Sequence, residues 1–467
     1  MSQQWAQVPH VAVVGGGLAG LAAGCALSRS GLRVTLFERR PYLGGRASSY
    51  EHPGTGEIVD NCQHVLLGCC TNLVDFYRRT GVEEKIRWFD RLTFLEPGGR
   101  ASVIAPSFLP APLHCAPAFL RAACLKLPDK LTIAAALAAL APMTPRDTGD
   151  SFLSWLRGHG QTARAIDRFW KTVLVSALNE DVDRVSVPYA AQVMRESFLK
   201  SAAAGRIGVP SVPLSELYGA AGDYIQARGG EVQCRRNVES FHAEFAGARL
   251  KVDGQEQSFD FVVFAVPFDV LGRMLPATTA AESLRMTLSR FRTSPITGIH
   301  LWFDRQITDL DHAVLLDRTI QWMFHKSKLL GRGNNGNGSY VELVVSSSKG
   351  LVEKSRPEIV DLALAELREF LPGARPANLV KSTVIKEVHA TYSPGPGVDQ
   401  YRPQPETVWP RIFLAGDWTA TGWPATMEGA VRSGYIAAER VARVAGIKDA
   451  SFLVQDLAAS GFMRLFG

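Results

Sequence analysis

Three closely spaced glycines near the start of the chain have the types and spacing that hold a phosphate group. Gly15, Gly17 and Gly20 follow the apolar run 11–14 and open a helix-like stretch over 18–30. In such a turn the first glycine permits a sharp bend and the second permits close approach of a pyrophosphate. The third lets the helix pack against the strand. The pattern predicts a strand, a phosphate-binding turn and a helix.

The start of that helix and the end of the next strand extend the predicted site. Leu18 and Ala19 present backbone N–H groups that a helix N-terminus leaves unpaired, and these attract an anion. The apolar run 32–37 then delivers Glu38, about twenty residues past the glycines, where a carboxylate binds an adenosine ribose. Arg39 follows it and is also expected to contact the cofactor. Strand, turn, helix, strand and acid in this order predict dinucleotide binding rather than a purely structural glycine turn.

Two further motifs indicate which dinucleotide is bound. Segment 43–47 contains Gly45, Arg46 and Ala47, and segment 411–434 contains Gly416 followed by Asp417. Two more glycines and an arginine can contact the pyrophosphate or a flavin from the other side. Together the motifs resemble the amine oxidase and phytoene desaturase superfamily of FAD proteins.

That resemblance implies roles for individual residues. Asp417 would bind the ribityl chain, the helix that starts at Met427 would face the flavin pyrimidine ring, and Val238 would lie against the adenine. Members that attach flavin covalently use a cysteine near the terminal motif, and no cysteine follows Cys234. The cofactor is therefore expected to be non-covalent FAD.

Composition narrows the class of protein further. The chain has 467 residues, 46% of them hydrophobic and 21% charged, and a formal net charge of +6. These values are ordinary for a globular protein, and without a dense basic stripe they give no support to nucleic-acid binding. No His, Cys or acidic cluster with metal-ligand spacing stands out, so no metal site is predicted. Segment 1–9 lacks the pattern of a signal peptide, which favours a cytoplasmic location.

The predicted fold class is α/β, with a discontinuous Rossmann-like FAD-binding domain and an inserted α+β substrate domain. The cofactor motifs are far apart in the chain, which requires the FAD-binding domain to be interrupted. The predicted division is 1–90, 226–280 and 405–446 for FAD binding, 91–225 for a helical part of the substrate domain, 281–404 for its sheet-containing part, and 447–467 for an amphipathic C-terminal tail.

Segment 101–143 is unusually poor in charge. Its uncharged part, 101–120, has nearly the length of a bilayer span, but prolines interrupt it. Two interpretations stay open: a buried wall of the substrate domain, or a monotopic face that dips into one leaflet. The apolar residues of the tail slightly favour the second, which places the protein peripherally on the inner face of the plasma membrane.

Segment 59–68 carries the predicted catalytic residues. Asn61, Gln63 and His64 follow the second glycine motif, in a segment that reaches the reactive side of the flavin in proteins of this type. The amides are candidates for hydrogen bonding to the flavin or to a substrate hydroxyl. His64 is a candidate proton donor because its ordinary pKa lies near neutral pH. The alternative is that His64 is a packing residue.

A sharper resemblance combines three segments. Residues 60–65, 178–183 and 415–430 look like those of the bacterial squalene-associated FAD-dependent desaturases, which are hydroxysqualene dehydroxylases of hopanoid biosynthesis. This resemblance implies reduction of hydroxysqualene to squalene by reduced FAD, with loss of water. It also implies a long apolar isoprenoid substrate and an external electron donor, which the motifs do not identify. Cys62 departs from the glycine that is more usual at its position in the superfamily.

Other functions fit parts of the same pattern. A carotenoid or polyprenoid desaturase would run the opposite hydride transfer on a similar scaffold. An amine oxidase would need an aromatic cage around the flavin, for which the sequence has no paired-tyrosine signal. A non-catalytic isoprenoid carrier would need to have lost the FAD site, whereas Gly15, Gly17, Gly20, Glu38 and Asp417 are all present.

Overall fold

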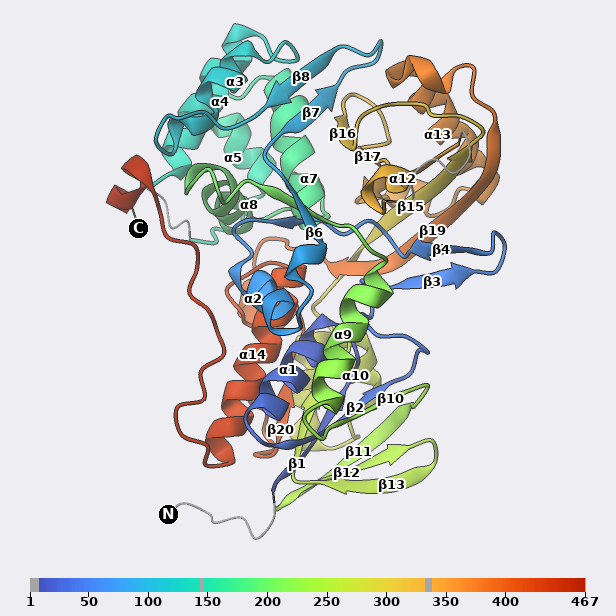
Figure 1. Ribbon diagram of the computed structural model, residues 1–467. Helices are drawn as coiled ribbons and strands as arrows, with labels where there is room; N and C mark the ends of the chain where they lie inside the picture. The colour runs from blue at the N-terminus through green and yellow to red at the C-terminus, as the bar shows by residue number, and fades with distance from the viewer. Residues whose placement is uncertain (1–7, 143–145, 332–337, 467) are drawn as a thin grey trace.

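A five-stranded parallel sheet forms the base of the molecule in a computed structural model, which describes residues 8–142, 146–331 and 338–466. Its strand order is β10-β2-β1-β14-β20, and every neighbouring pair is parallel. Helices α1, α9 and α14 cover it, with α1 packed between the other two (Figure 1). The bounds are β1 His10–Val14, α1 Leu18–Arg29, β2 Arg33–Glu38, α9 Leu214–Gln226, β10 Glu231–Cys234, β14 Phe261–Phe264, β20 Ile412–Leu414 and α14 Met427–Val444.

The apolar runs of β1 and β14 explain why these strands lie at the centre of the sheet. Val11, Val13 and Val263 are fully buried, as expected when helices or other elements cover both faces of a parallel sheet. The five strands come from three separate stretches of the chain. The predicted α/β class is confirmed.

A seven-stranded, largely antiparallel sheet lies above the parallel one. Its order is β19-β15-β18-β17-β16-β7-β8, with only β7 and β16 paired in parallel among the described strands. Helix α13 packs against it around a separate apolar core. The bounds are β7 Leu92–Leu95, β8 Ala101–Ile104, β15 Thr293–Phe303, β16 His312–Leu315, β17 Trp322–Phe324, β18 Ser339–Ser346, α13 Arg356–Phe370 and β19 Leu379–Tyr392.

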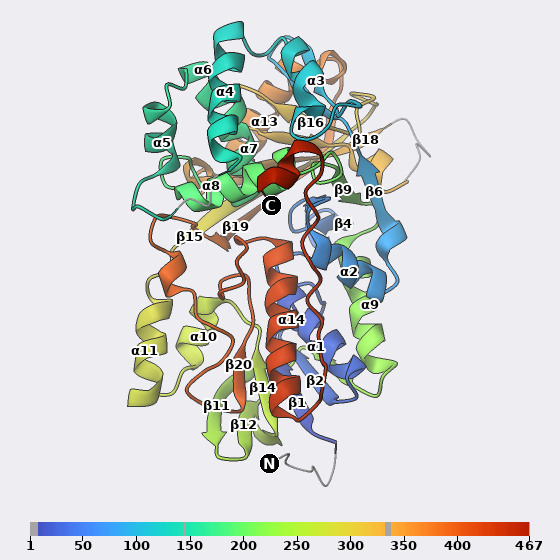
Figure 2. The same cartoon turned by 90° about the vertical axis from the view of Figure 1, so that its left-hand side faces the viewer.

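A cap of helices lies beside this sheet, from α3 to α8 (Figure 2). Two of its turns are π-helical, over Ile166–Lys171 and Met194–Leu199, a geometry that is common at functional sites. Among the described residues, no helix is long and apolar enough to cross a membrane. The bounds are α3 Ala116–Arg121, α4 Leu127–Leu140, α5 Phe152–Gly158, α6 Ala163–Ala165, α7 Thr172–Leu178 and α8 Val187–Val193.

The predicted helical segment 91–225 also contains strands. β7 and β8 form a hairpin because Gly98 and Gly99 take positive φ values of 93° and 84°, which only glycine adopts without strain. At the other end of the segment, α9 packs on α1 rather than in the cap. The last residue of the predicted apolar segment 101–143, Met143, lies outside the described residues.

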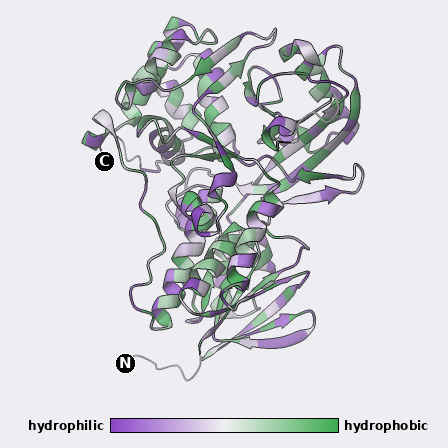
Figure 3. Cartoon of the chain, viewed as in Figure 1, coloured by the Kyte–Doolittle hydropathy of each residue, from purple (hydrophilic) through white to green (hydrophobic). Residues whose placement is uncertain are grey.

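Smaller elements complete the fold. Figure 3 shows hydrophilic residues along the protruding β3–β4 hairpin and the outer β11–β13 sheet, and apolar residues along the interior elements. The bounds are β3 Ser49–His52, β4 Glu57–Asp60, β5 Leu66–Leu67, α2 Thr71–Arg79, β6 Ile86–Phe89, β9 Ile207–Pro210, β11 Val238–Glu244, β12 Gly247–Val252, β13 Gln255–Phe259, α10 Phe268–Met274, α11 Thr279–Leu288 and α12 Lys326–Leu329, together with the C-terminal 3₁₀ turn η8, Gly461–Phe466.

Candidate active site

A cavity of about 540 Å³ runs from the carboxyl ends of the parallel strands into the space between the seven-stranded sheet and the helical cap. Its lower part is lined by the glycine turn, β2 and the segment after β20. Its upper part is lined mainly by apolar residues of β7, β8, α7 and β16–β18, with Thr172, Ser176 and Ser346 among them. All but one of the residues predicted from the sequence line it: Gly15, Gly17, Leu18, Ala19, Glu38, Arg39, Gly45, Arg46, Ala47, Asn61, Gln63, His64, Val238, Gly416, Asp417 and Met427.

The remaining predicted residue, Gly20, lies behind the glycine turn. A Cβ atom at Gly20 would stand 1.9 Å from the Gly15 carbonyl oxygen, and one at Gly15 would stand 2.7 Å from the Ala265 oxygen. At Gly17, by contrast, the nearest atom of the protein would be 3.9 Å away. Packing within the protein therefore requires glycine at 15 and 20, whereas Gly17 borders open cavity.

The glycine turn fits the diphosphate of a dinucleotide. Gly17 is the N-cap of α1, no side chain caps that helix end, and its first turn contains no acidic residue. The N–H groups there lie at the cavity wall. An anion in the cavity can accept hydrogen bonds from them and is stabilised by the helix dipole.

Glu38 has the geometry expected of a ribose acceptor. Its side chain is buried, and its two oxygens accept the backbone N–H groups of Gly16 and Arg40, each at 2.7 Å. These bonds fix the carboxylate at the cavity wall and leave further lone pairs available, because an ionised carboxylate has about four acceptor sites.

Arg46 and Asp417 join the two flavin motifs directly. One guanidinium nitrogen of Arg46 lies 2.9 Å from both Asp417 oxygens, and the other donates to the Ala390 carbonyl at 2.6 Å. The ion pair fixes the carboxylate that is predicted to bind the ribityl chain. Sequence reasoning placed both residues near the cofactor but did not predict their pairing.

Replacing Asp417 with alanine is expected to weaken FAD retention, since it removes one acceptor and leaves the Arg46 guanidinium without its carboxylate. The loss should be about tenfold or more in the dissociation constant. Flavin absorbance after gel filtration measures it. The exposed α13 residue Asp361, changed to alanine, is the control, and equal FAD occupancy in both variants would contradict the assignment.

Asn61 and His64 lie on the loop after β4. The Asn61 amide donates to the Arg46 carbonyl and to Glu387 Oε2, both at 3.1 Å. His64 Nδ1 lies 2.7 Å from the Cys62 carbonyl oxygen, so it carries a proton and donates. Burial lowers the pKa of His64, which leaves the ring neutral near pH 7 with Nε2 as an acceptor. The proton-donor role of His64 stays a prediction.

A buried lysine that the sequence did not reveal lies behind this loop. Lys326 Nζ lies 2.6 Å from Asp60 Oδ2, 2.7 Å from Gln63 Oε1 and 3.6 Å from Glu342 Oε2. All four side chains are buried. Burial raises the pKa of Glu342 to about 8, which favours its protonated form and leaves Asp60 as the main counter-charge of Lys326.

Lys326 also decides which way the Gln63 amide points. An ammonium group only donates, so it must face the Gln63 oxygen, and the amide nitrogen takes the opposite position, where it donates to the His64 carbonyl at 3.0 Å. Gln63 therefore offers N–H rather than carbonyl oxygen at this wall of the cavity.

A family model described as flavin containing amine oxidoreductase matches residues 18–442. The chain belongs to this family. The FAD cofactor predicted from the motifs is confirmed, and the chain is an FAD-dependent oxidoreductase of the carotenoid desaturase and amine oxidase type.

The similarity to known proteins extends over nearly the whole chain. A 15-cis-phytoene desaturase from Synechococcus elongatus is 27% identical over 92% of this chain and 95% of its own length. A probable zeta-carotene desaturase from the same organism is also 27% identical, over 92% and 98%. The solved structure of cyclohexylamine oxidase from Brevibacterium oxydans has a TM-score of 0.68 at 16% identity and covers 94% of this chain and 99% of that one, which supports the fold.

Proposed function

We propose that the chain is an FAD-dependent dehydroxylase that reduces hydroxysqualene to squalene. The observation that carries this proposal is the lining of the cavity, which continues from the cofactor residues to a mainly apolar part, the apolar arm. Leu92, Ile104, Val173 and Val314 line that arm, and such a lining suits a long hydrocarbon chain. The likeness of segments 60–65, 178–183 and 415–430 to hydroxysqualene dehydroxylases supports this choice of substrate.

Bound FAD in its reduced form supplies a hydride for such a reaction. The residues of the chain bind and orient the substrate around it. Gln63 offers its remaining amide N–H, which suits the oxygen of a hydroxyl group, and the apolar arm holds the hydrocarbon chain away from water. The overall change balances as hydroxysqualene plus reduced FAD giving squalene, water and oxidised FAD. An external donor then has to reduce the flavin again.

A polyprenoid desaturase is the second candidate, and the phytoene desaturase relative favours it. Amine oxidation has less support, because no tyrosine is among the described residues that line the cavity. The buried Tyr189–Tyr392 pair, with 3.0 Å between the two hydroxyl oxygens, is not part of its wall. A carrier without FAD is disfavoured by the family and its cofactor.

An anaerobic experiment separates the candidates. Photoreduced enzyme is mixed with hydroxysqualene while the flavin spectrum is followed, and the extract is analysed by mass spectrometry. Return of the oxidised flavin band together with squalene supports the dehydroxylase, and squalene used as substrate is the control that should leave the flavin reduced. A flavin that stays reduced with hydroxysqualene overturns the proposal. Oxidised enzyme that dehydrogenates a polyene in the presence of a quinone identifies the desaturase.

His64→Ala tests the predicted proton donor. Because burial lowers the pKa of His64, its acid form is present below that pKa and disappears as pH rises through it. If His64 protonates the leaving hydroxyl, kcat/KM of the wild type falls with rising pH over that interval. The variant loses this dependence, and its rate falls by about 10²-fold or more. His242→Ala, on an exposed position of β11, is the control, and full turnover of His64→Ala would exclude the role.

We also propose that the helical cap contacts an anionic membrane surface from the cytoplasmic side. Phe108, Leu120 and Leu131 are 96%, 61% and 62% exposed, and Leu465 of η8 is 79% exposed. The Phe462 N–H donates to the Ala111 carbonyl at 2.8 Å, which joins η8 to this face (Figure 2). Four basic residues lie close to these apolar ones in the chain: Arg121, Lys126, Lys130 and Arg464.

The cavity reaches the same part of the cap. Residues 104–106 line it together with His114 and Cys115, and they flank the exposed Phe108 in the chain. A bilayer against this face would offer an apolar substrate a route that avoids water. Apolar contact and basic charge together are the features of peripheral membrane binding.

Phe108→Ser combined with Leu465→Ser is expected to reduce binding to vesicles that contain phosphatidylglycerol. Each large apolar side chain inserted into lipid contributes about 1.5–3 kcal/mol, so loss of both should lower the affinity by about 10²- to 10⁴-fold. Co-sedimentation measures the change. Phe245→Ser is a matched control, because Phe245 is 101% exposed but lies at the β11–β12 turn, at the other end of the molecule from the cap (Figure 1). Equal binding by the double variant and the wild type would contradict the proposed face.

A further inference from the structure

The C-terminal segment after α14 crosses the surface from the parallel sheet to the helical cap (Figure 1, Figure 2). Between 451 and 460 it has no regular secondary structure and is held by side chains of other elements. Glu439 accepts the N–H groups of Phe452 and Leu453 at 2.7 and 3.0 Å. Asn72 exchanges two hydrogen bonds with the Val454 backbone, at 2.8 and 3.1 Å.

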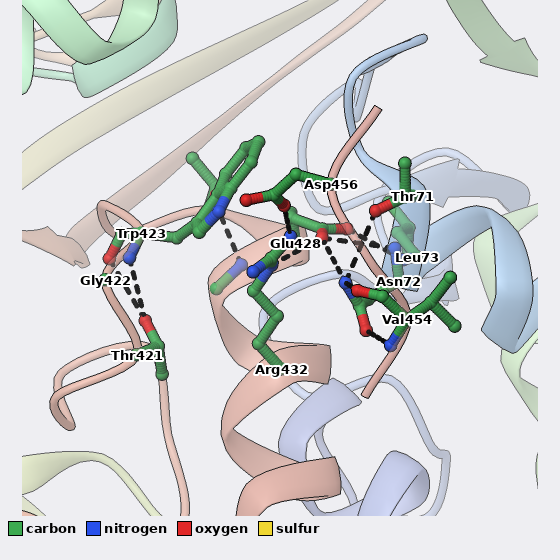
Figure 4. Close-up of polar contacts among 12 residues, drawn as sticks. Thr71, Asn72, Leu73, Thr421, Gly422, Trp423, Glu428, Arg432, Val454 and Asp456 are labelled. Carbon is green, nitrogen blue, oxygen red and sulfur yellow. Dashed lines mark hydrogen bonds and ion pairs between the residues drawn. The ribbon is translucent and has the colours of Figure 1, made fainter. Parts of the chain in front are cut away.

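Arg432 of α14 is the point where this segment meets the cavity wall (Figure 4). Its guanidinium donates to Glu428 Oε1 at 2.7 Å and pairs with Asp456 of the C-terminal segment. The guanidinium carbon also lies 4.6 Å from the centre of the Trp423 ring, within the range of a cation–π contact. Asp456, Arg432 and Trp423 thus form a continuous chain of contacts.

Trp423 belongs to the cavity wall. Its side chain is buried and packs in a small apolar cluster with Cys69 and Ala204, against which Leu457 of the C-terminal segment also packs. The neighbouring Glu428 lines the cavity too and accepts the N–H groups of Asn72 and Leu73 at 3.1 and 2.7 Å. Those bonds cap α2 with a carboxylate from α14.

We infer that segment 452–457 is a strap whose residues Asp456 and Leu457 position Trp423 in the cavity wall. Asp456 does this through Arg432, and Leu457 does it by apolar packing. Asp456 is half-exposed, so its loss leaves no buried charge, and Glu428 still pairs with Arg432. Without the strap the indole gains freedom, and the wall it forms becomes a poorer fit to a long substrate. The effect on substrate rests on the proposed function, whereas the effect on Trp423 does not.

Fluorine NMR of the holoenzyme labelled with 5-fluorotryptophan tests the strap. Trp423→Phe assigns the resonance of this residue. Asp456→Asn, alone and combined with Leu457→Ala, should shift or broaden that resonance, while Asp456→Glu should retain it. Asp449→Asn is the control, because Asp449 is exposed, precedes the strap and has a positive φ that asparagine tolerates. An unchanged Trp423 resonance in both Asp456→Asn variants overturns the strap.

Kinetics of the same variants test its consequence for substrate. KM for hydroxysqualene should rise several-fold in Asp456→Asn with little change in kcat, because the strap shapes the wall and touches no reacting atom. A moved resonance with unchanged KM overturns the role in substrate fit. A moved resonance in an enzyme that does not turn over hydroxysqualene leaves the strap intact and counts against the proposed function alone.

Discussion

Lys326→Met is expected to lower the free energy of unfolding by about 3–5 kcal/mol, the usual cost of breaking a buried ion pair by removing one partner. The exposed fraction of Asp60 is only 4%, so the variant leaves its carboxylate buried without a counter-charge. It also leaves the Gln63 oxygen without its donor. Urea unfolding of the FAD-loaded protein, followed by far-UV circular dichroism, measures the loss.

Two companion variants separate this cause from the loss of a lysine as such. Lys328→Met removes a partly exposed lysine from the same short helix. Lys328 Nζ lies 3.7 Å from Asp311 Oδ1, and loss of this exposed pair should lower the free energy of unfolding by about 1 kcal/mol or less. Asp60→Asn combined with Lys326→Met should recover most of the stability, because no unpaired charge stays buried. If Lys326→Met costs no more than Lys328→Met, the buried pair is not the anchor of this loop.

Gly20→Ala is expected to weaken FAD binding by about 10- to 100-fold. The added methyl group would stand 1.9 Å from the Gly15 oxygen, so α1 or the glycine turn must shift, and overpacking of this kind costs about 1–3 kcal/mol. The shift falls on the N–H groups at the start of α1, which face the diphosphate. Titration of the apoprotein with FAD, followed by flavin fluorescence, measures the change.

Gly219→Ala is the matched control for this substitution. Gly219 lies in α9, and a Cβ atom there would meet nothing within 4 Å. Alanine has the higher helix propensity, so this variant should bind FAD normally and be slightly more stable. Wild-type affinity in Gly20→Ala would show that the turn tolerates the methyl group and that close packing at Gly20 does not govern binding.

The glycine motif of the cofactor site could be recognised in the sequence because its residues lie close together in the chain. The spacing of Gly15, Gly17 and Gly20 identifies them, although the requirement for glycine at 15 also comes from the distant Ala265 oxygen. The apolar runs of β1 and β2 are long enough to identify buried parallel strands on either side of that turn. The role of Asp417 is predicted differently, from the resemblance of segment 411–434 to the terminal motif of the FAD family.

The polar groups that support the site could not be predicted in the same way. Lys326 and Asp60 are 266 residues apart. Residue type does not distinguish a lysine that is buried in an ion pair from one on the surface. The same holds for Arg432 and Asp456, whose effect on Trp423 depends on where an irregular segment crosses the surface. Burial and partner choice are properties of the packed molecule, because the cost of removing a charge from water depends on all the elements around it.

By itself the sequence determined that this protein has a dinucleotide site in an α/β domain, since turn geometry and strand burial follow from residue type and short-range spacing. Its resemblance to a family of FAD proteins identified the dinucleotide as FAD, which the family match confirms. Only the tertiary structure decided that Lys326 orients the Gln63 amide and that the cavity continues into an apolar arm. It also decided that the C-terminal segment packs near Trp423. These features depend on contacts between residues that folding brings together from different sheets and helices. Such contacts cannot be predicted from short-range patterns in the chain.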